Sequence, residues 1–472
     1  MKVLLALLAA LLSPCAFAID LAAREPAATT PMHETVILYA IPAFFLLIGV
    51  EMVVSWLRGR DAYRLDDAIC SMSMGILSQI SGVVTRLLPV GIYALVFDHL
   101  ALVRWPEFAW WGWLLAIGFY DFCYYWLHRM GHQVALLWAA HAAHHQSEEF
   151  NLSTALRQTS TDALHEWIFF LPLALAGIPP QAFAAISVGH LLYQYWIHTQ
   201  MIDRLGWFDR VFASPSNHRV HHAINDPYID KNFGGILIIW DRLFGTFAAE
   251  RHDIRIAYGT RQPLRSLNPL WANVQVYVLT ARRMGELQGL GDKLQLWLRA
   301  PGWQPAPVAG QRSGAPFVPP ATPFAPPLVL PRSRRVYCAL QFAALLAAAA
   351  HFLGYCLEMP RAEAIAYFCY LLAQMMVLGA LLEGRSSAAL LEGLRLVATM
   401  AVVVFGARWF GVPRLAPEEI AVAGAAGLAL MALLVWSGKG WATGPPAART
   451  AMSPVFSPDS GRGASRVAGD RG

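Results

Sequence analysis

Long apolar stretches alternate with shorter polar segments along most of the 472-residue chain. One apolar stretch covers Thr35–Leu57, and another covers Trp110–Leu127. Both approach the roughly 20 residues that an α-helix needs to cross a bilayer. Residues 67–103 are less apolar and fit either one crossing with an interfacial helix or a helical hairpin. The hydrophobic pattern therefore predicts several membrane-crossing helices in the first part of the chain.

The rest of the chain is predicted to contain a helical hairpin, then a water-facing region, and then four further membrane crossings. Residues 163–200 hold two apolar stretches separated by Gly-Ile-Pro-Pro at 177–180, which is typical of a helical hairpin that enters the bilayer and returns. Residues 203–260 are polar and aromatic, so we expect them to face water. Four further apolar stretches are found at 336–357, 364–383, 387–410 and 416–436.

Three segments are expected to lie outside this helical framework. Residues 1–18 carry Lys2, an apolar run and a final Ala-Phe-Ala, which predicts a signal peptide, with an uncleaved anchor as the alternative. Residues 300–335 are rich in proline and predict a linker. Residues 438–472 show no periodicity and are predicted to be disordered.

The composition agrees with a membrane protein. Hydrophobic residues make up 56% of the chain and charged residues 14%, and the mean hydropathy is +0.42. The net charge of +5 is scattered, so no nucleic-acid surface is indicated. The six cysteines form no C-x-x-C pair, which argues against a disulfide framework and against a cysteine metal site. The expected fold is an all-α integral membrane protein built around a transmembrane helical bundle.

Eight of the fifteen histidines lie in three short clusters with helical spacing. The clusters are HRMGH (His128, His132), HAAHH (His141, His144, His145) and HRVHH (His218, His221, His222). Residues three or four apart share one face of a helix. Eight imidazoles buried near a bilayer without a shared partner would carry a large desolvation cost, which a bound metal removes. Because more than four histidines overfill one tetrahedral site, the pattern predicts two metals.

The ligand type alone does not distinguish iron from zinc. An apolar substrate in a lipid environment favours an oxygen-using pair of irons, since hydrolysis would have little to act on there.

The chain resembles the fatty acid hydroxylase/sterol desaturase superfamily of membrane di-iron enzymes, and within it the alkylglycerol monooxygenase subfamily. The resemblance rests on DFCYYWLHRMGH, HAAHHQSEEFNLSTALRQ, LLYQYWIHT and SNHRVHHAINDPYIDKNFGGILIIWDRLFGTF. It is dense over residues 110–255 and looser elsewhere. It implies a metal-bearing helical cap on the cytoplasmic face of the bundle.

The resemblance also implies the site residues and the reaction. It assigns the catalytic metal site to His128, His132, His141, His144, His145, His218, His221 and His222. His198 corresponds to a further ligand in some members, and a headgroup-facing histidine is the alternative. The implied activity is O2-dependent hydroxylation of a membrane lipid at an ether-linked carbon, which would cleave alkylglycerols. The implied reductant is tetrahydrobiopterin, and a separate redox protein stays open as the electron donor.

Other functions remain open from the residues alone. A related enzyme would hydroxylate or desaturate a sterol, carotenoid or fatty acyl chain. A histidine-ligated haem electron carrier and a lipid or metal transporter are the non-enzymatic alternatives. The expected organisation is a hydroxylase domain at 35–260 and C-terminal transmembrane helices at 336–436. We expect a multi-pass protein of the bacterial inner membrane with its active site on the cytoplasmic side. Arg58, Arg60 and Arg64 follow the first crossing and mark that side.

Several residues near the clusters have open roles. We expect His165 to be structural, and His190 fits either the core or a place beside the metal ligands. Metal-bound histidines need a hydrogen-bond acceptor for the second ring nitrogen. The candidate acceptors are Asp121, Glu148, Asn151, Asp162 and Asp230. Arg157 and Lys231 fit contacts with a lipid phosphate or an anionic cofactor, or an anchoring role at the membrane surface.

Overall fold

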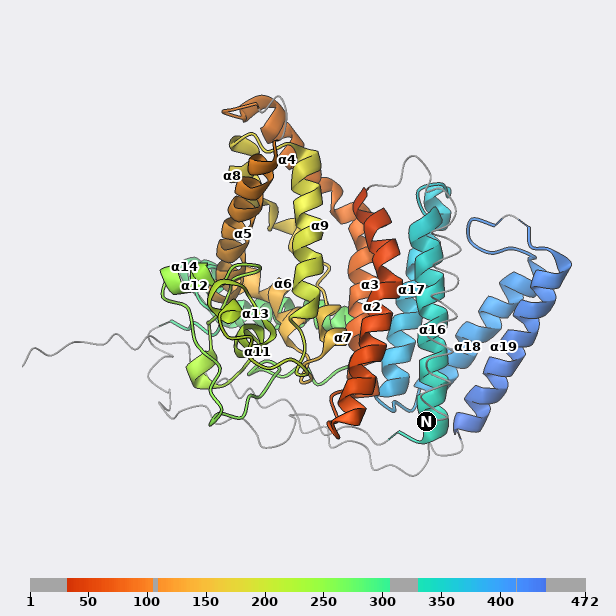
Figure 1. Cartoon of the computed structure of the whole chain (residues 1–472). Helices are drawn as coiled ribbons and strands as arrows, with labels where there is room; N and C mark the ends of the chain where they lie inside the picture. Colours follow the sequence, from red (N-terminus) through yellow and green to blue (C-terminus); the bar gives the residue numbers. More distant parts are fainter. Residues whose placement is uncertain (1–31, 105–108, 306–329, 413, 439–472) are drawn as a thin grey trace, which may run out of the picture.

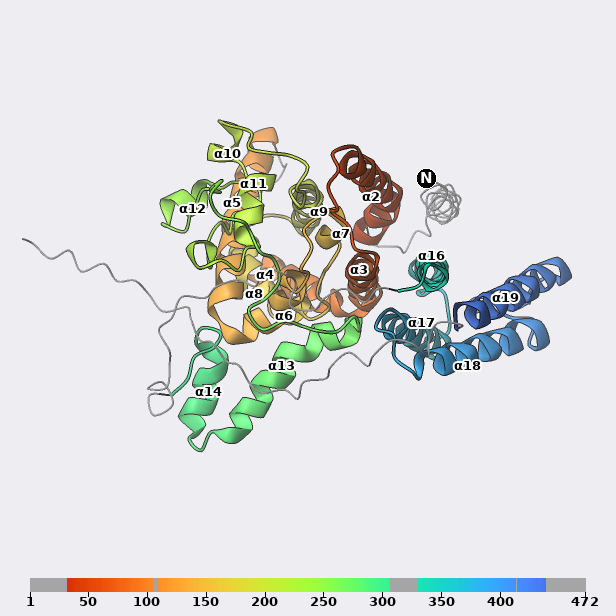
Figure 2. The same cartoon turned by 90° about the horizontal axis from the view of Figure 1, so that it is seen from below.

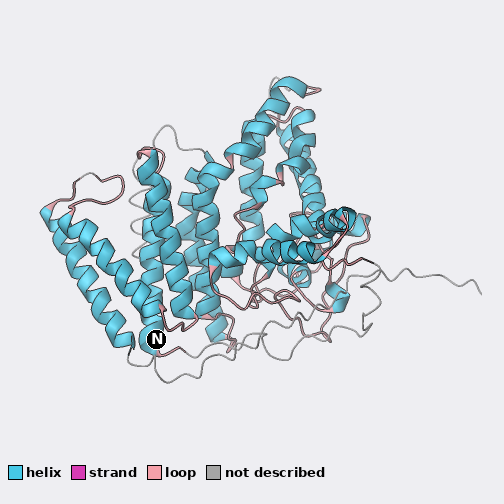
Figure 3. Cartoon of the chain, turned by 180° about the vertical axis from the view of Figure 1, so that it is seen from behind, coloured by secondary structure: helices cyan, strands magenta, loops and turns pink. Residues whose placement is uncertain are grey.

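The computed structural model describes residues 32–104, 109–305, 330–412 and 414–438. The predicted signal peptide at 1–18, most of the predicted linker and nearly all of the predicted disordered tail lie outside these residues. Within the described ranges the regular elements are helices, accompanied by two isolated β-bridges, Phe212–Leu237 and Trp409–Val412 (Figure 3). The predicted all-α fold is confirmed.

Among the residues that the structure describes, six helices are long and apolar enough to cross a membrane. They are α2 (Met32–Leu57), α3 (Leu65–Thr85), α16 (Arg332–Tyr355), α17 (Arg361–Leu382), α18 (Ala388–Met400) with the π-helical turn η3 (Ala401–Phe405), and α19 (Pro417–Gly438). The last four coincide with the four predicted C-terminal stretches. The chain is an integral, multi-pass membrane protein.

Residues 67–103 were predicted to form either one crossing with an interfacial helix or a helical hairpin, and the structure does not contain the hairpin. Only Arg86 separates α3 from α4 (Leu87–Leu100), and it keeps helical backbone angles of φ −71° and ψ −16°. The two helices therefore form one nearly continuous run instead of a hairpin (Figure 1). The chain then returns along α5 (Trp110–Gln133).

The helix α5 covers the predicted crossing Trp110–Leu127 but is not one of the six helices that are apolar enough to cross a membrane. It starts at the predicted Trp110, continues to Gln133, and includes Asp121 and Arg129. It packs with α4, α8 (Trp167–Leu175) and α9 (Pro180–Trp196) around Tyr93, Tyr120 and Phe170. The predicted helical hairpin at 163–200 is present as α8 and α9, joined at Gly177, whose φ is +82°.

The helices α16 and α17 pack directly against α3, and α18 and α19 pack against α17 and α16. Their shared core includes Ile69, Leu77, Tyr337 and Leu371. This core also holds a buried ion pair, in which Arg395 Nη2 lies 2.7 Å from Glu392 Oε1. The contacts with α3 make these helices part of one membrane bundle.

A cap of short helices covers the lower ends of α5 and α9 in Figure 1. It consists of α6 (Ala135–His145), α7 (Leu152–Ala155), η1 (Asp162–Leu164), α10 (Phe208–Val211), α11 (Pro215–His221), η2 (Asp226–Tyr228), α12 (Ile239–Leu243), α13 (Pro269–Glu286) and α14 (Leu290–Leu298). The end of α5 and the short α6 and α11 bring the histidine clusters together in this cap.

Candidate metal centre

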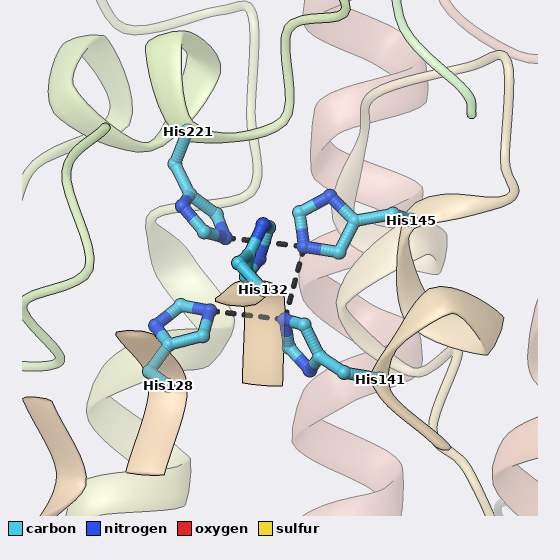
Figure 4. A group of neighbouring side chains, drawn as sticks. All are labelled: His128, His132, His141, His145 and His221. Atoms are coloured by element: carbon cyan, nitrogen blue, oxygen red, sulfur yellow. Dashed lines mark hydrogen bonds between the residues drawn. The ribbon is translucent and has the colours of Figure 1, made fainter. Parts of the chain in front are cut away.

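The structure brings all nine predicted histidines together in two groups, and the ligand atoms of each group lie within 4.8 Å of one another. The first group holds His128, His132, His141, His145 and His221, and Figure 4 shows their rings directed toward a common centre. The second group holds His144, His198, His218 and His222. Two groups of this kind are suited to two metals.

Each H-x-x-H-H cluster is divided between the two groups, which the sequence reading did not foresee. On α6, His141 and His145 are four residues apart and join the first group, whereas His144 joins the second. On α11 the pattern is reversed, since His218 and His222 join the second group and His221 joins the first. Residues four apart lie on the same side of a helix, whereas the residue next to one of them points about 100° away from that side. The middle histidine of each cluster is therefore directed toward the other group.

The Nε2 atoms within each group are in near contact. In the first group, His141 Nε2 lies 3.0 Å from both His128 Nε2 and His145 Nε2. In the second group, His198 Nε2 lies 3.2 Å from His144 Nε2 and 2.9 Å from His218 Nε2. The stacked rings of His145 and His222, with centroids 4.3 Å apart, join the two groups.

Main-chain carbonyls fix the orientation of four of these rings. The Nδ1–H groups donate to carbonyl oxygens at 2.8–3.0 Å, in the pairs His128–Phe233, His144–Arg157, His198–Gln194 and His221–Lys231. A neutral imidazole that donates from Nδ1 carries a lone pair on Nε2. These four Nε2 atoms are therefore available to bind a metal.

For four of the rings, main-chain carbonyls take the place of the predicted acidic or amide acceptors. Asp230 lies 3.6 Å from His132 Nδ1 and is the nearest match. Asp121 is bonded to His190 instead, and Asn151 caps α7 through the N–H of Ser153. The carbonyls of Arg157, Lys231 and Phe233 lie in irregular segments beside the rings, whereas that of Gln194 belongs to the last turn of α9, one turn before His198.

Two features of the buried histidines fit a cation in each group. His144 and His198 both use their Nδ1 protons on carbonyls, so their Nε2 lone pairs face each other at 3.2 Å. A metal between them would relieve this repulsion. In the first group, the buried Nε2 of His132 has no hydrogen-bond partner among the described residues, although buried polar atoms are normally paired.

The protonation states also favour metal binding. Burial lowers the pKa of His144 to about 4. Burial and neighbouring imidazoles lower the pKa values of His145, His221 and His222 well below the ordinary value. A histidine with a lowered pKa is neutral at pH 7, which is the form that ligates metals.

Arg157 lies inside the cap, so both predicted roles at a surface are wrong. Its side chain is 1% exposed. Its guanidinium donates to the carbonyl of Ala143 at 2.8 Å and to Gln146 Oε1 at 3.3 Å, while its own carbonyl accepts from His144 Nδ1. Arg157 therefore holds the last turn of α6 and the ring of His144 in one arrangement.

We expect Arg157→Lys to reduce metal occupancy mainly in the second group. Lysine keeps the charge but lacks the planar donor fork that reaches Ala143 and Gln146. Loss of an outer contact to a metal ligand typically lowers metal affinity by about 10–100-fold. Metal titration of the purified variant measures this. Arg251→Lys is the matched control, because Arg251 is exposed and pairs with Asp253 at the surface; equal losses in both variants would contradict this role for Arg157.

A tight loop between Asp230 and Asp241 closes the first group. Asp241 accepts from the N–H groups of Phe233 and Gly234 at 2.8 and 2.7 Å, so it fixes the carbonyl that orients His128. A Cβ on Gly235 would lie 2.3 Å from the ring of His190. Glycine is required here because any larger residue would collide with His190.

Asp121 of α5 and His190 of α9 anchor the same loop to these two helices. Asp121 is fully buried, and it accepts from His190 Nε2 at 2.8 Å and from the N–H groups of Ile236 and Leu237 at 2.7 and 2.9 Å. Trp240 Nε1 donates to it as well. His190 thus belongs to the core beside the metal ligands. His165 lies outside both groups.

Comparisons with known proteins agree with this geometry. A fatty acid hydroxylase family model matches residues 113–246. Alkylglycerol monooxygenase from Homo sapiens is 36% identical and covers 78% of this chain and 82% of the relative. The proteins of the same name from Danio rerio and Xenopus tropicalis are 37% and 36% identical, covering 78% and 75% of this chain and 82% and 78% of the relatives. No solved structure gives a significant match.

The two histidine groups, the membrane helices and these matches lead to one assignment. A relative of this identity and coverage supports the monooxygenase reading over the haem-carrier and transporter alternatives. The chain belongs to the alkylglycerol monooxygenase family, an iron-dependent branch of the fatty acid hydroxylases, and is a membrane-bound monooxygenase.

Proposed function

We propose that this chain hydroxylates the ether-linked carbon of alkylglycerols with two irons held by the nine histidines. One oxygen atom of O2 enters the C–H bond, and the other leaves as water after uptake of two electrons and two protons. The resulting hemiacetal separates into an aldehyde and a glycerol. The observation that carries this proposal is the pair of histidine groups inside the cap of a chain so similar to alkylglycerol monooxygenases.

The ligand sets follow from the two groups. His128, His132, His141, His145 and His221 would hold one iron, and His144, His198, His218 and His222 the other. The irons would supply O2 binding and its reductive activation. The rings would bind the irons through the lone pairs of their ring nitrogens.

Two phenylalanines keep water away from the groups. Phe150 and Phe233 are both fully buried. The ring centroid of Phe150 lies 5.1 Å from that of His222, and the centroid of Phe233 lies 5.2 Å from that of His132. A dry site protects a reactive oxidant from side reactions and suits an apolar substrate.

We place the histidine groups on the cytoplasmic side. Arg58 and Arg60, which follow α2, donate to the carbonyls of Met201 and Gln200 at 2.6 and 3.0 Å. These carbonyls lie just after His198, so the basic cluster and the metal centre share one end of the bundle. Basic residues next to a span favour the cytoplasm. Labelling an exposed cap cysteine, Asp253→Cys, in intact and permeabilised cells tests this, and labelling in intact cells would contradict it.

The proposed reductant is tetrahydrobiopterin. A monooxygenase needs a lipid, O2 and an electron donor, and the similarity to alkylglycerol monooxygenases supports a pterin as that donor. The test quantifies iron and zinc per chain and then supplies an alkylglycerol, O2 and tetrahydrobiopterin to the same sample. We expect two irons and the fatty aldehyde. Two irons without aldehyde would contradict this substrate and reductant and favour a sterol, carotenoid or acyl-chain reaction. A folded sample without iron would contradict the di-iron proposal.

A further inference from the structure

The helices α13 and α14 lie across the membrane bundle. In Figure 2, α2, α3, α9 and α16 are seen nearly end-on, whereas α13 and α14 are seen from the side. The spans α2, α3 and α16 must follow the membrane normal closely enough to cross it. Therefore α13 and α14 run approximately along the plane of the membrane.

One face of α14 carries an exposed row of leucines. Leu290, Leu294 and Leu298 are 72%, 55% and 63% exposed, and their spacing of four places them on one side of the helix. Leu296, by contrast, is 4% exposed and faces the protein. Soluble surfaces rarely present a continuous apolar row of this kind, whereas interfacial helices place such a row among lipid acyl chains.

The surroundings of this hairpin also point to lipid. Tyr277 of α13 donates its hydroxyl to Thr161 Oγ1 at 3.1 Å, so α13 passes beside the segment that leads into α8. Leu164 and Ile168, which follow Thr161, are 59% and 52% exposed. The exposed apolar surface that leads into α8 therefore begins where α13 passes beside Thr161.

The charges near the hairpin suit lipid headgroups. Basic residues outnumber acidic residues between 282 and 299. The basic ones are Arg282, Arg283, Lys293 and Arg299, and the acidic ones are Glu286 and Asp292. Long basic side chains can cover apolar surface with their stems and place their charges at headgroup level.

We propose that α13 and α14 form a membrane-surface hairpin that inserts Leu290, Leu294 and Leu298 into a phospholipid interface. The hairpin is tied to the metal centre, because the N–H of Ala135 at the start of α6 donates to the carbonyl of Arg299 at 2.9 Å. Its contact with lipid thus sets the height of α6, which carries three of the nine histidines. This inference goes beyond the proposed reaction and does not depend on its substrate.

Spin-label accessibility in the full chain tests the hairpin. Leu294→Cys is labelled in a cysteine-free background and reconstituted into phospholipid nanodiscs. Two reference labels give the responses expected in lipid and in water. Leu428→Cys lies on the exposed face of the span α19, and Asp253→Cys lies on the exposed surface of the cap. Each label is challenged with oxygen, which concentrates in acyl chains, and with an anionic chromium complex, which stays in water.

We expect the label at Leu294 to respond as the label at Leu428 does, with high collision rates for oxygen and low rates for the chromium complex. A response like that of the Asp253 label would overturn the inference. Metal content, measured on the same samples, establishes that the variants are folded around the metal centre.

Discussion

Alanine at His144 or at His221 should remove metal and abolish turnover, while the chain still inserts into the membrane. Each residue belongs to a different group, so we expect His144→Ala to lose the second-group metal and His221→Ala to weaken the first. Changes to residues that only orient a ligand typically cost about 10–100-fold in metal affinity or activity, so loss of a ligand should cost more. Elemental analysis and aldehyde formation on the same sample measure both effects.

His165→Ala is the matched control for these two variants. This histidine is half-buried, follows the cap helix η1, and lies outside both groups. It should retain wild-type metal content. Full metal content in His144→Ala or His221→Ala would contradict the assignment of that residue as a ligand.

Asp121→Ala should destabilise the loop that closes the first histidine group. The carboxylate accepts from four donors, two of which are the N–H groups of Ile236 and Leu237. An unsatisfied buried N–H costs about 1–3 kcal/mol. The full change should lower the free energy of unfolding by about 3–5 kcal/mol, as expected when one partner of a buried charged network is removed. Thermal unfolding of the purified protein measures this loss.

The same variant should also bind less metal. The loop held by Asp121 includes Phe233, whose carbonyl orients His128. Asp253→Ala is the control, because its carboxylate is exposed at the surface of the cap, and surface changes of this kind usually stay within about 0.5 kcal/mol. An Asp121→Ala protein with normal stability would show that the network does not support the loop.

The histidine clusters and the main helices could be predicted because their signals are local. A spacing of three or four residues identifies a shared helical face, and an apolar run identifies a span. The region of α13 and α14 was not predicted as helical, since its residues are amphipathic and not uniformly apolar. The leucines at 290, 294 and 298 were the signal that would have indicated it.

The supports of the metal centre could not be predicted because they join distant segments. His128 is oriented by a carbonyl 105 residues away, and Asp121 bonds to residues more than 100 positions later. Arg157 has a polar side chain that suggested a surface, yet it fills the space between α6 and α3, where Cys70 and Ser71 meet it. Only the packing of helices defines these contacts.

The division of each cluster between two groups has a consequence for biogenesis. The first group requires His221 and the second requires His218 and His222, so neither is complete until the last cluster has been synthesised and folded. A nascent chain that ends before residue 218 already carries six of the nine histidines, yet it holds only partial sites of lower affinity. Iron insertion is therefore expected to be a late event that follows membrane integration, and both metal sites become competent at nearly the same moment of synthesis.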